Sequence, residues 1–174
     1  IAGIYGGHTD ALDGMLDCIP HRGPDDTGHF VDETVPVSMG AQRLSIVGLE
    51  SGSQPVTNED GSVVVVFHGE IYNYPELRED PGPRGPTFRP NCDTEVLVHL
   101  WEEYGETFPE RLNGMFAFSL WDRDRETLFL ARDRLGIKPL YVAQSDEQVV
   151  WGSEIPAVLA AGVDRTIDER AVYN

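Results

Sequence analysis

The amino-acid sequence predicts an α+β fold in which two antiparallel sheets pack against each other with helices on the outside. The first observation is that the second half holds four short apolar segments. Their connections are too short for helical crossovers, so neighbouring strands are expected to pair antiparallel. The second observation is a segment with a clear helical pattern, residues 91–105. The third is size, because 174 residues, 40% of them hydrophobic, suffice for one compact domain with its own core.

The first half of the chain alternates strand and helix signals. Ile1–Tyr5 is typical of a short strand, and Asp10–Ile19 has a weak helical pattern with its apolar residues on one face. His21–Gly28 is rich in turn-forming residues and predicts a loop. Strands are predicted at about Val35–Leu49 and Ser62–His68, and the second of them begins as an unbroken run of valines.

The segment "NCDTEVLVHLWEEYG", residues 91–105, predicts the best helix of the chain. Asn91 or Asp93 can cap its N-terminus, Glu95 lies in its first turn, and Gly105 is a natural end. The residues predicted to form its buried stripe are Val96, Leu97, Leu100, Trp101 and Tyr104.

The rest of the second half is predicted to be mostly strands. Glu79–Pro90, with four prolines and two glycines, predicts a loop before the helix. Asp122–Glu126 predicts a solvated hairpin turn, because it lacks the oxygen ligands and central glycine of a calcium loop. Glu154–Ala161 predicts a short helix that ends at Gly162. The predicted strands lie at residues 115–122, 127–133, 138–145 and 148–154.

The charge balance is strongly acidic. Thirty acidic residues face 13 basic ones, for a formal net charge of −17, and Lys138 is the single lysine. Such a surface repels nucleic acid and anionic lipid, so neither is expected as a partner. Abundant acidic residues with almost no lysine suggest a halophilic protein, kept in concentrated salt. No apolar run reaches the ~20 residues of a membrane span, and no leader opens the chain, so we expect a cytoplasmic protein.

The sequence predicts neither a disulfide framework nor a metal site. Cys18 and Cys92 are too few and too far apart for either, and are interpreted as reduced, partly buried thiols. The segment "HRGPDD", residues 21–26, groups a histidine with two aspartates but has no partner at metal-ligand spacing. A loop fixed by Arg22 and the Gly-Pro pair is the favoured interpretation.

Three weak signals together predict a site for an amino acid. Singly, Arg43 could be a surface cation, Gly69 a turn residue, and Asp93 a helix cap. Together, the arginine can bind an α-carboxylate through two hydrogen bonds, and the aspartate can bind an α-ammonium group. Backbone groups around Gly69 and Glu70, at the end of a buried strand, can hold the remainder of the ligand.

Seven segments spread over nearly the whole chain match a known pattern in order and spacing: "HRGPDDTG", "QRLSIVGLESGSQPV", "GEIYNYPELR", "NCDTEVLVHLWEEYG", "LNGMFAFSLWD", "LARDRLGIKPLY" and "GSEIPAVL". With these segments the chain resembles the glutaminase domain of glutamine-hydrolysing asparagine synthetase. That family implies an N-terminal-nucleophile fold, a four-layer αββα sandwich of two antiparallel sheets between helices. It also implies a reaction in which an N-terminal cysteine attacks the side-chain amide of glutamine, releases ammonia and leaves a thioester that water cleaves.

The resemblance implies roles for individual residues of this chain. Arg43 would bind the α-carboxylate of glutamine and Asp93 its α-ammonium group. Gly69 and Glu70 would hold the ligand, with an amide N–H of this pair directed at the oxyanion, and His68 occupies the position of the family's oxyanion asparagine. Backbone contacts to the substrate would come from Leu44, Ser45, Ile46 and Val47.

Two departures from the family pattern affect the expected activity. The family begins Cys-Gly-Ile, whereas this sequence begins Ile1-Ala2-Gly3, so the nucleophile is missing as written. His68 stands where the family has asparagine, and losing one oxyanion donor costs on the order of 10²–10³ in turnover. Three interpretations stay open: residues absent from the start of the sequence, a glutaminase that has lost activity, and a non-catalytic glutamine-binding or interaction module.

The expected organisation is a class II glutaminase domain at residues 1–162 and the start of a linker at residues 163–174. ATP and Mg²⁺ are expected in a separate synthetase domain of the parent chain, since no ATP pyrophosphatase loop is present here. The expected partners are glutamine and that synthetase domain, and a homodimer stays open. A related amidotransferase that uses another acceptor is the alternative within the same class.

Overall fold

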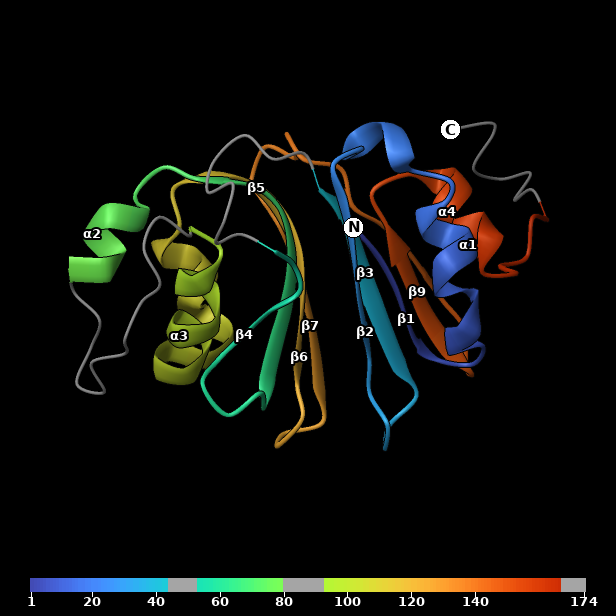
Figure 1. Ribbon diagram of the computed structural model, residues 1–174, viewed down its shortest axis with the longest axis horizontal. Helices are drawn as coiled ribbons and strands as arrows, with labels where there is room; N and C mark the ends of the chain where they lie inside the picture. Colours follow the sequence, from blue (N-terminus) through green and yellow to red (C-terminus); the bar gives the residue numbers. More distant parts are fainter. Residues whose placement is uncertain (44–52, 80–92, 167–174) are drawn as a thin grey trace.

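The computed structural model describes residues 1–43, 53–79 and 93–166. It consists of four layers, in which two sheets face each other and each is covered on its outer side by helices (Figure 1). The paired strands of both sheets run antiparallel. The predicted α+β class with two packed antiparallel sheets is therefore confirmed. No helix within the described ranges is both long and apolar enough to span a bilayer.

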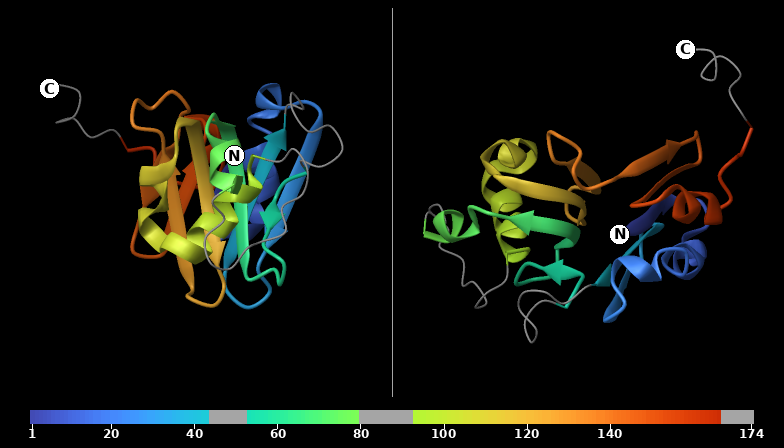
Figure 2. Two further views of the ribbon diagram at one scale, coloured as in Figure 1. Left: turned by 90° about the vertical axis from the view of Figure 1, so that its left-hand side faces the viewer. Right: turned by 90° about the horizontal axis from the view of Figure 1, so that it is seen from above.

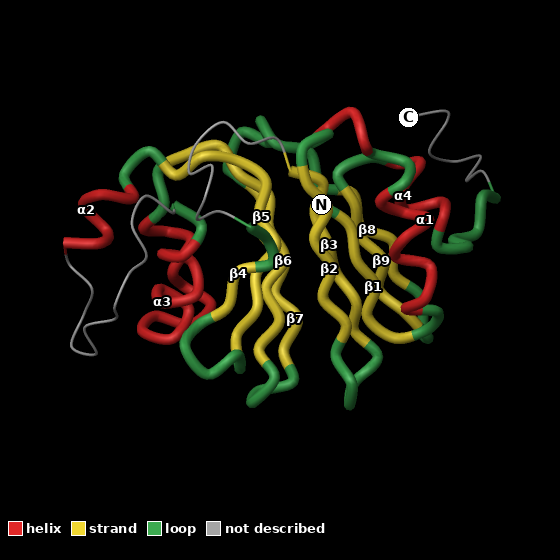
Figure 3. Tube along the Cα trace, viewed as in Figure 1, coloured by secondary structure: helices red, strands yellow, loops and turns green. Residues whose placement is uncertain are grey.

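The first sheet has the strand order β2-β3-β1-β9-β8, so the chain begins in the central strand. Helices α1 (Leu12–Leu16) and α4 (Ile155–Ala160) cover its outer face (Figure 3). A 3-10 turn, η1 (Thr9–Ala11), precedes α1, and a second, η2 (Pro20–Arg22), follows it. The strands are β1 (Ala2–Gly6), β2 (Asp26–Val31), β3 (Val37–Arg43), β8 (Tyr141–Gln144) and β9 (Gln148–Gly152).

The second sheet has the strand order β4-β5-β6-β7. Helix α3 (Glu95–Tyr104) and the 3-10 helix η3 (Gly105–Arg111) pack on its outer face, beside the short helix α2 (Tyr74–Glu79). The strands are β4 (Val56–Thr57), β5 (Val63–Ile71), β6 (Gly114–Asp122) and β7 (Thr127–Arg132).

The unbroken valine run is explained by a strand that is buried on both faces. Val63 and Val65 pack with α3 in one apolar cluster, whereas Val64 and Val66 belong to the cluster between the sheets. Successive side chains of a strand point to opposite faces, and here both faces are covered. The loss of the usual polar alternation thus follows from the four-layer architecture.

The predicted helix forms, but its N-terminus differs from the prediction. Thr94 occupies the N-cap without a side-chain cap hydrogen bond, and Asn91 lies outside the described residues. The Asp93 carboxylate instead accepts a hydrogen bond from the Ile71 backbone N–H, with 3.4 Å between Oδ2 and N. Gly105 ends the helix in a positive-φ conformation, as expected.

Several other boundaries differ because tertiary contacts override local pattern. Asp10–Ile19 holds only a 3-10 turn and five residues of α-helix, and the end of the predicted loop His21–Gly28 is the start of β2. Strands β7 and β8 follow each other but lie in different sheets, so the prediction that these neighbours pair is wrong. Within the predicted stripe Tyr104 is only partly buried, whereas Val98, which was not predicted, is buried.

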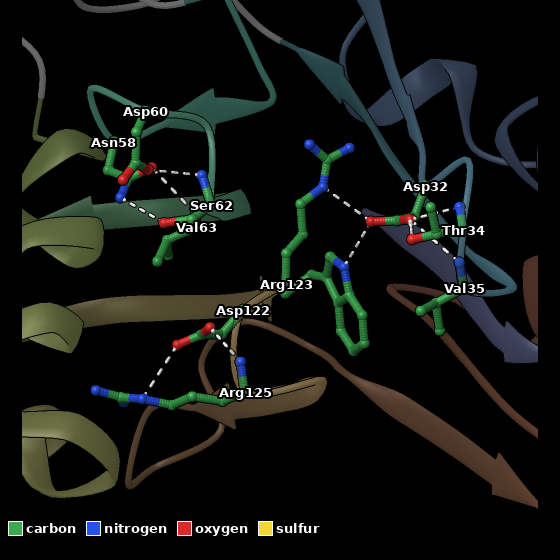
Figure 4. A network of polar contacts seen from close by, with 11 residues as sticks. Asp32, Thr34, Val35, Asn58, Asp60, Ser62, Val63, Asp122, Arg123 and Arg125 are labelled. Atoms are coloured by element: carbon green, nitrogen blue, oxygen red, sulfur yellow. Dashed lines mark hydrogen bonds and ion pairs between the residues drawn. The ribbon is translucent and has the colours of Figure 1, made fainter.

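Asp32 connects the two sheets at one end of the sandwich (Figure 4). Its Oδ2 accepts hydrogen bonds from Trp121 Nε1 at 3.0 Å and from Arg123 Nε at 2.8 Å, both from the β6–β7 end of the opposite sheet. Its Oδ1 accepts from the backbone N–H groups of Thr34 and Val35 and from the Thr34 hydroxyl. Burial alone would raise the pKa of Asp32, but these hydrogen bonds hold it well below its usual range.

Replacing Asp32 with alanine is expected to lower the free energy of unfolding by about 3 kcal/mol, because buried donors left unpaired cost roughly 1–3 kcal/mol each. Urea denaturation at pH 7 measures it. Since the folded pKa is depressed, the contribution exists above the ordinary value of 3.8 and is lost as pH falls below it. Asp124→Ala, an exposed position in the neighbouring turn, is the matched control and should change stability by less than about 0.5 kcal/mol. Equal effects of the two substitutions would contradict this role.

Candidate functional site

The candidate site lies at the other end of the sandwich from Asp32, where β1 begins. Ile1 is 2% exposed and belongs to the apolar cluster between the sheets. The first nitrogen of the chain donates a hydrogen bond to Ser153 Oγ at 2.9 Å, and the Ser153 N–H donates to the Ile1 carbonyl. Seen from above, the start of the chain lies near the junction of the two sheets (Figure 2). The backbone nitrogen and the carbonyl of Ile1, just before β1, are therefore both hydrogen-bonded to Ser153.

An ion-pair cluster borders this position. Arg22 Nε and His21 Nε2 both contact Glu154 Oε1, at 2.5 Å and 2.7 Å. Hydrogen bonds from His21 and from Arg22 lower the pKa of Glu154. The sequence predicted that Arg22 would fix its loop, and the structure confirms it. The partner could not be predicted, because it lies 132 residues away along the chain.

The amino group of Ile1 has a strongly perturbed protonation. Burial, the larger cause, and the Arg22 charge together lower its pKa to about 5, although Glu154 opposes the shift. Burial at the start of β1 therefore disfavours a positive charge at this position.

His68, in β5, lies within the same electrostatic environment. Burial is the main cause that lowers its pKa to about 4, and the first amino group when protonated, Lys138 and Arg22 act in the same direction. Its Nδ1 is buried and makes no hydrogen bond in the structure. The side chain is therefore a neutral imidazole at neutral pH with one ring nitrogen left for a ligand.

Gly69 is required by the packing of the strands. Its φ is +155°, and a Cβ at this position would lie 2.1 Å from the Met115 carbonyl oxygen of β6. No larger residue fits, whether or not a ligand binds. Glu70 is exposed. Gly69 helped to suggest a ligand site, but the close packing of β5 on β6 is enough to explain why this residue is glycine.

Arg43 ends the described part of β3 on the opposite sheet. Its carbonyl accepts a hydrogen bond from the Asp25 N–H at 3.1 Å, and Gly23 packs so closely that a Cβ there would lie 2.3 Å from the Arg43 nitrogen. The segment 23–25 therefore fixes this backbone. The predicted backbone contacts of Leu44, Ser45, Ile46 and Val47 lie outside the described residues.

Gln54 fixes the chain where it returns to β5, and the sequence reasoning did not identify it. Its Nε2 donates to the Phe67 carbonyl at 2.8 Å, and its Oε1 accepts from the Phe67 N–H at 2.7 Å. This pair of bonds immediately precedes His68 in the chain. Gln54 lies in the segment "SGSQPV", residues 51–56. A glutamine before a proline has no intrinsic preference for bonding the backbone of a distant strand, so the sequence could not predict these two hydrogen bonds.

Asp93 lies beside Ile71, the last residue of β5. Burial raises its pKa, partly offset by its hydrogen bond from Ile71. Ile71 lies three positions after His68, which is roughly 10 Å along an extended strand. The structure brings the start of β1, His68 and Arg22 together. That Arg43 and Asp93 converge on one ligand stays a prediction.

One cluster away from this site has the composition of a metal centre. Glu59, His99 and Glu102 place one potential ligand atom each within 4.8 Å of one another. The Glu102 carboxylate is already occupied, by Asn58 Nδ2 at 2.9 Å and by His99 Nδ1 at 3.2 Å. Hydrogen bonds within the cluster account for this arrangement, and the expectation of no metal stays a prediction.

The sequence was compared with known families and proteins. The family model described as "Glutamine amidotransferase domain" matches residues 1–174. Asparagine synthetase [glutamine-hydrolyzing] 1 of Bacillus subtilis is 44% identical over 158 residues, 91% of this chain and 25% of that protein. Asparagine synthetase [glutamine-hydrolyzing] 2 of rice is 43% identical over 84% of this chain, and amidase chry2 of Gibberella zeae is 38% identical over 89%.

The solved structures agree in fold. Glutamine phosphoribosylpyrophosphate amidotransferase from Bacillus subtilis superposes with a TM-score of 0.75 at 23% identity, covering 92% of this chain and 43% of that one. At this identity the likeness establishes the fold alone, which is the N-terminal-nucleophile type that the sequence predicted. The chain spans about a quarter of the length of the Bacillus and rice relatives that it matches.

The buried imidazole leads to a stability prediction. Between pH 6.5 and about 4 the unfolded histidine binds a proton and the folded one does not, so lowering the pH through this window destabilises the folded state. Relative to His68→Asn, the wild-type chain should lose about 2 kcal/mol of unfolding free energy between pH 7 and pH 4, allowing for partial solvent screening. Chemical denaturation across this range measures the loss. Parallel pH profiles of the two proteins, or an NMR titration of His68 near 6.5, would contradict the prediction.

Proposed function

Because the chain belongs to the family of glutamine amidotransferase domains, we propose that its site binds glutamine and that its parent protein releases the side-chain amide as ammonia. The observation that carries this proposal is the meeting of the buried start of β1 with His68 and Arg22 at one end of the sandwich. Burial there would keep an amine placed ahead of β1 uncharged, and the His68 ring nitrogen that makes no hydrogen bond offers a donor beside it.

The register of β1 indicates where a nucleophile would stand. Ala2 pairs with Gly40 and Gly3 with Met39, so each step back along β1 is a step forward along β3. If β1 were extended by two residues, the first of them would lie opposite Arg43. The family motif has its cysteine at that position. The extension would thus place a thiol across from the residue proposed to bind the α-carboxylate.

The proposed reaction uses groups of this chain around that thiol. The α-amine of the first residue takes the thiol proton, the sulfur attacks the amide carbon, and ammonia leaves as the C–N bond breaks. Water then cleaves the thioester, giving glutamate and restoring the thiol. His68 would donate to the oxyanion from Nδ1 in the tautomer that carries its proton there, assisted by the N–H of the Gly69–Glu70 pair.

Substrate recognition is proposed to rest on opposite charges. Arg43 would bind the α-carboxylate, with backbone contacts from residues 44–47, and Asp93 would bind the α-ammonium group. The raised pKa of Asp93 is what a half-buried carboxylate shows without a cation, and a bound ammonium group would stabilise its charged form.

The parent protein is proposed to be an asparagine synthetase that uses this ammonia to convert aspartate to asparagine with ATP and Mg²⁺ in a second domain. The similarity to asparagine synthetases over most of this chain supports this acceptor. Two relatives named as amidases, each 38% identical, favour a second candidate function, in which a different acceptor takes the ammonia. A cytoplasmic setting, a domain end at residue 162 and a homodimer remain parts of the proposal.

Adding Cys-Gly ahead of Ile1 is expected to give a chain that releases ammonia from glutamine, because the thiol and its own amine then enter the site. A coupled assay for glutamate and ammonia measures it. The same chain with Ser-Gly added is the matched control and should be inactive. His68→Asn in the Cys-Gly chain should raise turnover at least about ten-fold, because the amide reaches the oxyanion as the family's asparagine does. An inactive Cys-Gly, His68→Asn chain that still folds would count against the proposed reaction.

Glutamine binding is expected to weaken as the pH is lowered through the raised pKa of Asp93, since a protonated carboxyl no longer attracts the α-ammonium group. Calorimetric titration with glutamine between pH 4 and pH 8 would measure this. Asp93→Asn should bind at least about ten-fold more weakly at pH 7 and lose the pH dependence. Arg43→Ala should also weaken binding, whereas Glu76→Gln, at an exposed site on α2, should not. Unchanged affinity in both Asp93→Asn and Arg43→Ala would contradict the recognition mode.

A further inference from the structure

The side chain of His68 faces the space between the two sheets. Val66 and Val64, two and four positions earlier in β5, belong to the apolar cluster between the sheets, and the side chains of a strand alternate between its faces. The cross-strand neighbour of His68 on β6, the uncharged Ala117, belongs to the same cluster. Ile1, just before β1, is a further member. The imidazole therefore lies on the inner face of β5, in the layer where β1 begins.

One atom of this ring lacks the partner that a buried polar atom needs. Nδ1 of His68 is buried and forms no hydrogen bond within the described ranges. The residue as a whole is only partly buried, so a dissolved ligand can approach the ring. A buried polar atom that is left unpaired destabilises the folded protein, and a ligand that bonds it removes this penalty. A polar ligand group therefore gains more at His68 than at an ordinary surface contact.

Cationic groups from three separate elements act on this imidazole. They are the amino group at the start of β1 when protonated, the Lys138 ammonium group in the connection from β7 to β8, and the Arg22 guanidinium of η2. Arg22 is paired with Glu154, which offsets part of its charge, and Glu70, the next residue but one in β5, is exposed. The net charge of the whole chain is −17. A group of cations acting on one ring is a local exception to that charge, and it favours an anionic ligand.

The position of Lys138 is fixed by the second sheet. The buried Asp133 carboxylate, just after β7, accepts hydrogen bonds on Oδ2 from the Lys138 N–H at 2.9 Å and from the Phe116 N–H at 3.2 Å. Phe116, in β6, pairs with Gly69, the residue after His68. The lysine backbone is thereby tied to the part of the sheet that holds the imidazole. Because these bonds do not involve the lysine side chain, a substitution that removes its charge leaves the connection intact.

We propose that His68 makes this site prefer L-glutamate over L-glutamine, because an imidazolium ring donates a charge-assisted hydrogen bond to the side-chain carboxylate of the acid. This inference deepens the proposed function and rests on it, since it supposes that the side chain of the bound amino acid ends at His68. The two ligands share their α-carboxylate and α-ammonium groups and differ only in the side-chain carboxylate or amide. Hydrogen bonds to ionised groups are roughly twice as strong as those between neutral groups. In the proposed reaction glutamate is the product, so the preference would slow its release.

Glutamate binding is expected to bring a proton into the site. In the free protein the imidazole is neutral above about pH 4, and a carboxylate against the ring raises its pKa. His68 therefore takes up a proton from solvent when glutamate binds, whereas glutamine binding requires none. Between the two pKa values, the affinity for glutamate relative to glutamine rises by up to about ten-fold for each unit by which the pH falls. Asp93 acts on the α-ammonium group that both ligands share, so its own titration cancels in this ratio.

The test is calorimetric titration of the 174-residue chain with L-glutamate and with L-glutamine between pH 5.5 and pH 8. Glutamate is expected to bind at least about ten-fold more tightly at pH 5.5, with a ratio that falls as the pH rises. Glutamate titrations in two buffers of different ionisation enthalpy measure the proton uptake. His68→Asn should remove both the preference and the uptake. Lys138→Met should lower the preference at least about three-fold, whereas Arg134→Met, which removes the same charge from an exposed position of the same connection, should not.

Two results would overturn the proposal. One is equal affinity for the two ligands at every pH, which would leave glutamine recognition and the proposed function intact. The other is a preference for glutamate that is unchanged in both His68→Asn and Lys138→Met, which would assign it to other groups. Binding of neither amino acid by the folded chain would overturn the proposed function together with this inference. A preference that depends on His68, found together with an inactive Cys-Gly chain, would support the inference and count against the proposed reaction alone.

Discussion

The central position of β1 is the constraint on which the rest of the structure depends. Because β1 pairs with β3 on one side and with β9 on the other, the beginning of the chain is held in register between two strands that come from distant parts of the sequence. Ile1 is thereby buried and hydrogen-bonded to Ser153. A strand end that is fixed on both edges can hold a reactive group in one place, which a frayed terminus cannot do.

The two ends of the sandwich differ in how their buried polar groups are satisfied. At one end Asp32 satisfies the polar groups of Trp121 and Arg123 from the opposite sheet, in an environment that keeps its carboxylate charged. At the other end Arg22 and Glu154 pair, but the buried imidazole of His68 is not satisfied in this way. Burial there lowers the pKa of His68 and leaves its Nδ1 without a partner, which is an energetic cost that a bound ligand can offset.

The same end of the molecule combines the unpartnered His68 Nδ1 with a rigidly held connection from β7 to β8. Asp133 illustrates how the fold achieves this, since one buried carboxylate holds a connection that contributes both exposed Leu135 and the positive charge of Lys138. The net charge of −17 describes the whole sequence, and the single lysine of the chain, Lys138, lies in this connection.

The sequence by itself determined the fold class, the helix that Gly105 ends, and the strands of the second half, because these follow from local periodicity and turn chemistry. It also predicted a site that includes Asp93, which matches a family motif, and His68, which departs from one, and their roles stay predictions. Only the tertiary structure decided that β7 and β8 lie in different sheets, that Arg22 meets Glu154, and that Asp93 bonds Ile71 and does not cap its helix. These outcomes depend on contacts between residues far apart in the chain, and the local sequence does not specify which distant group a side chain will contact.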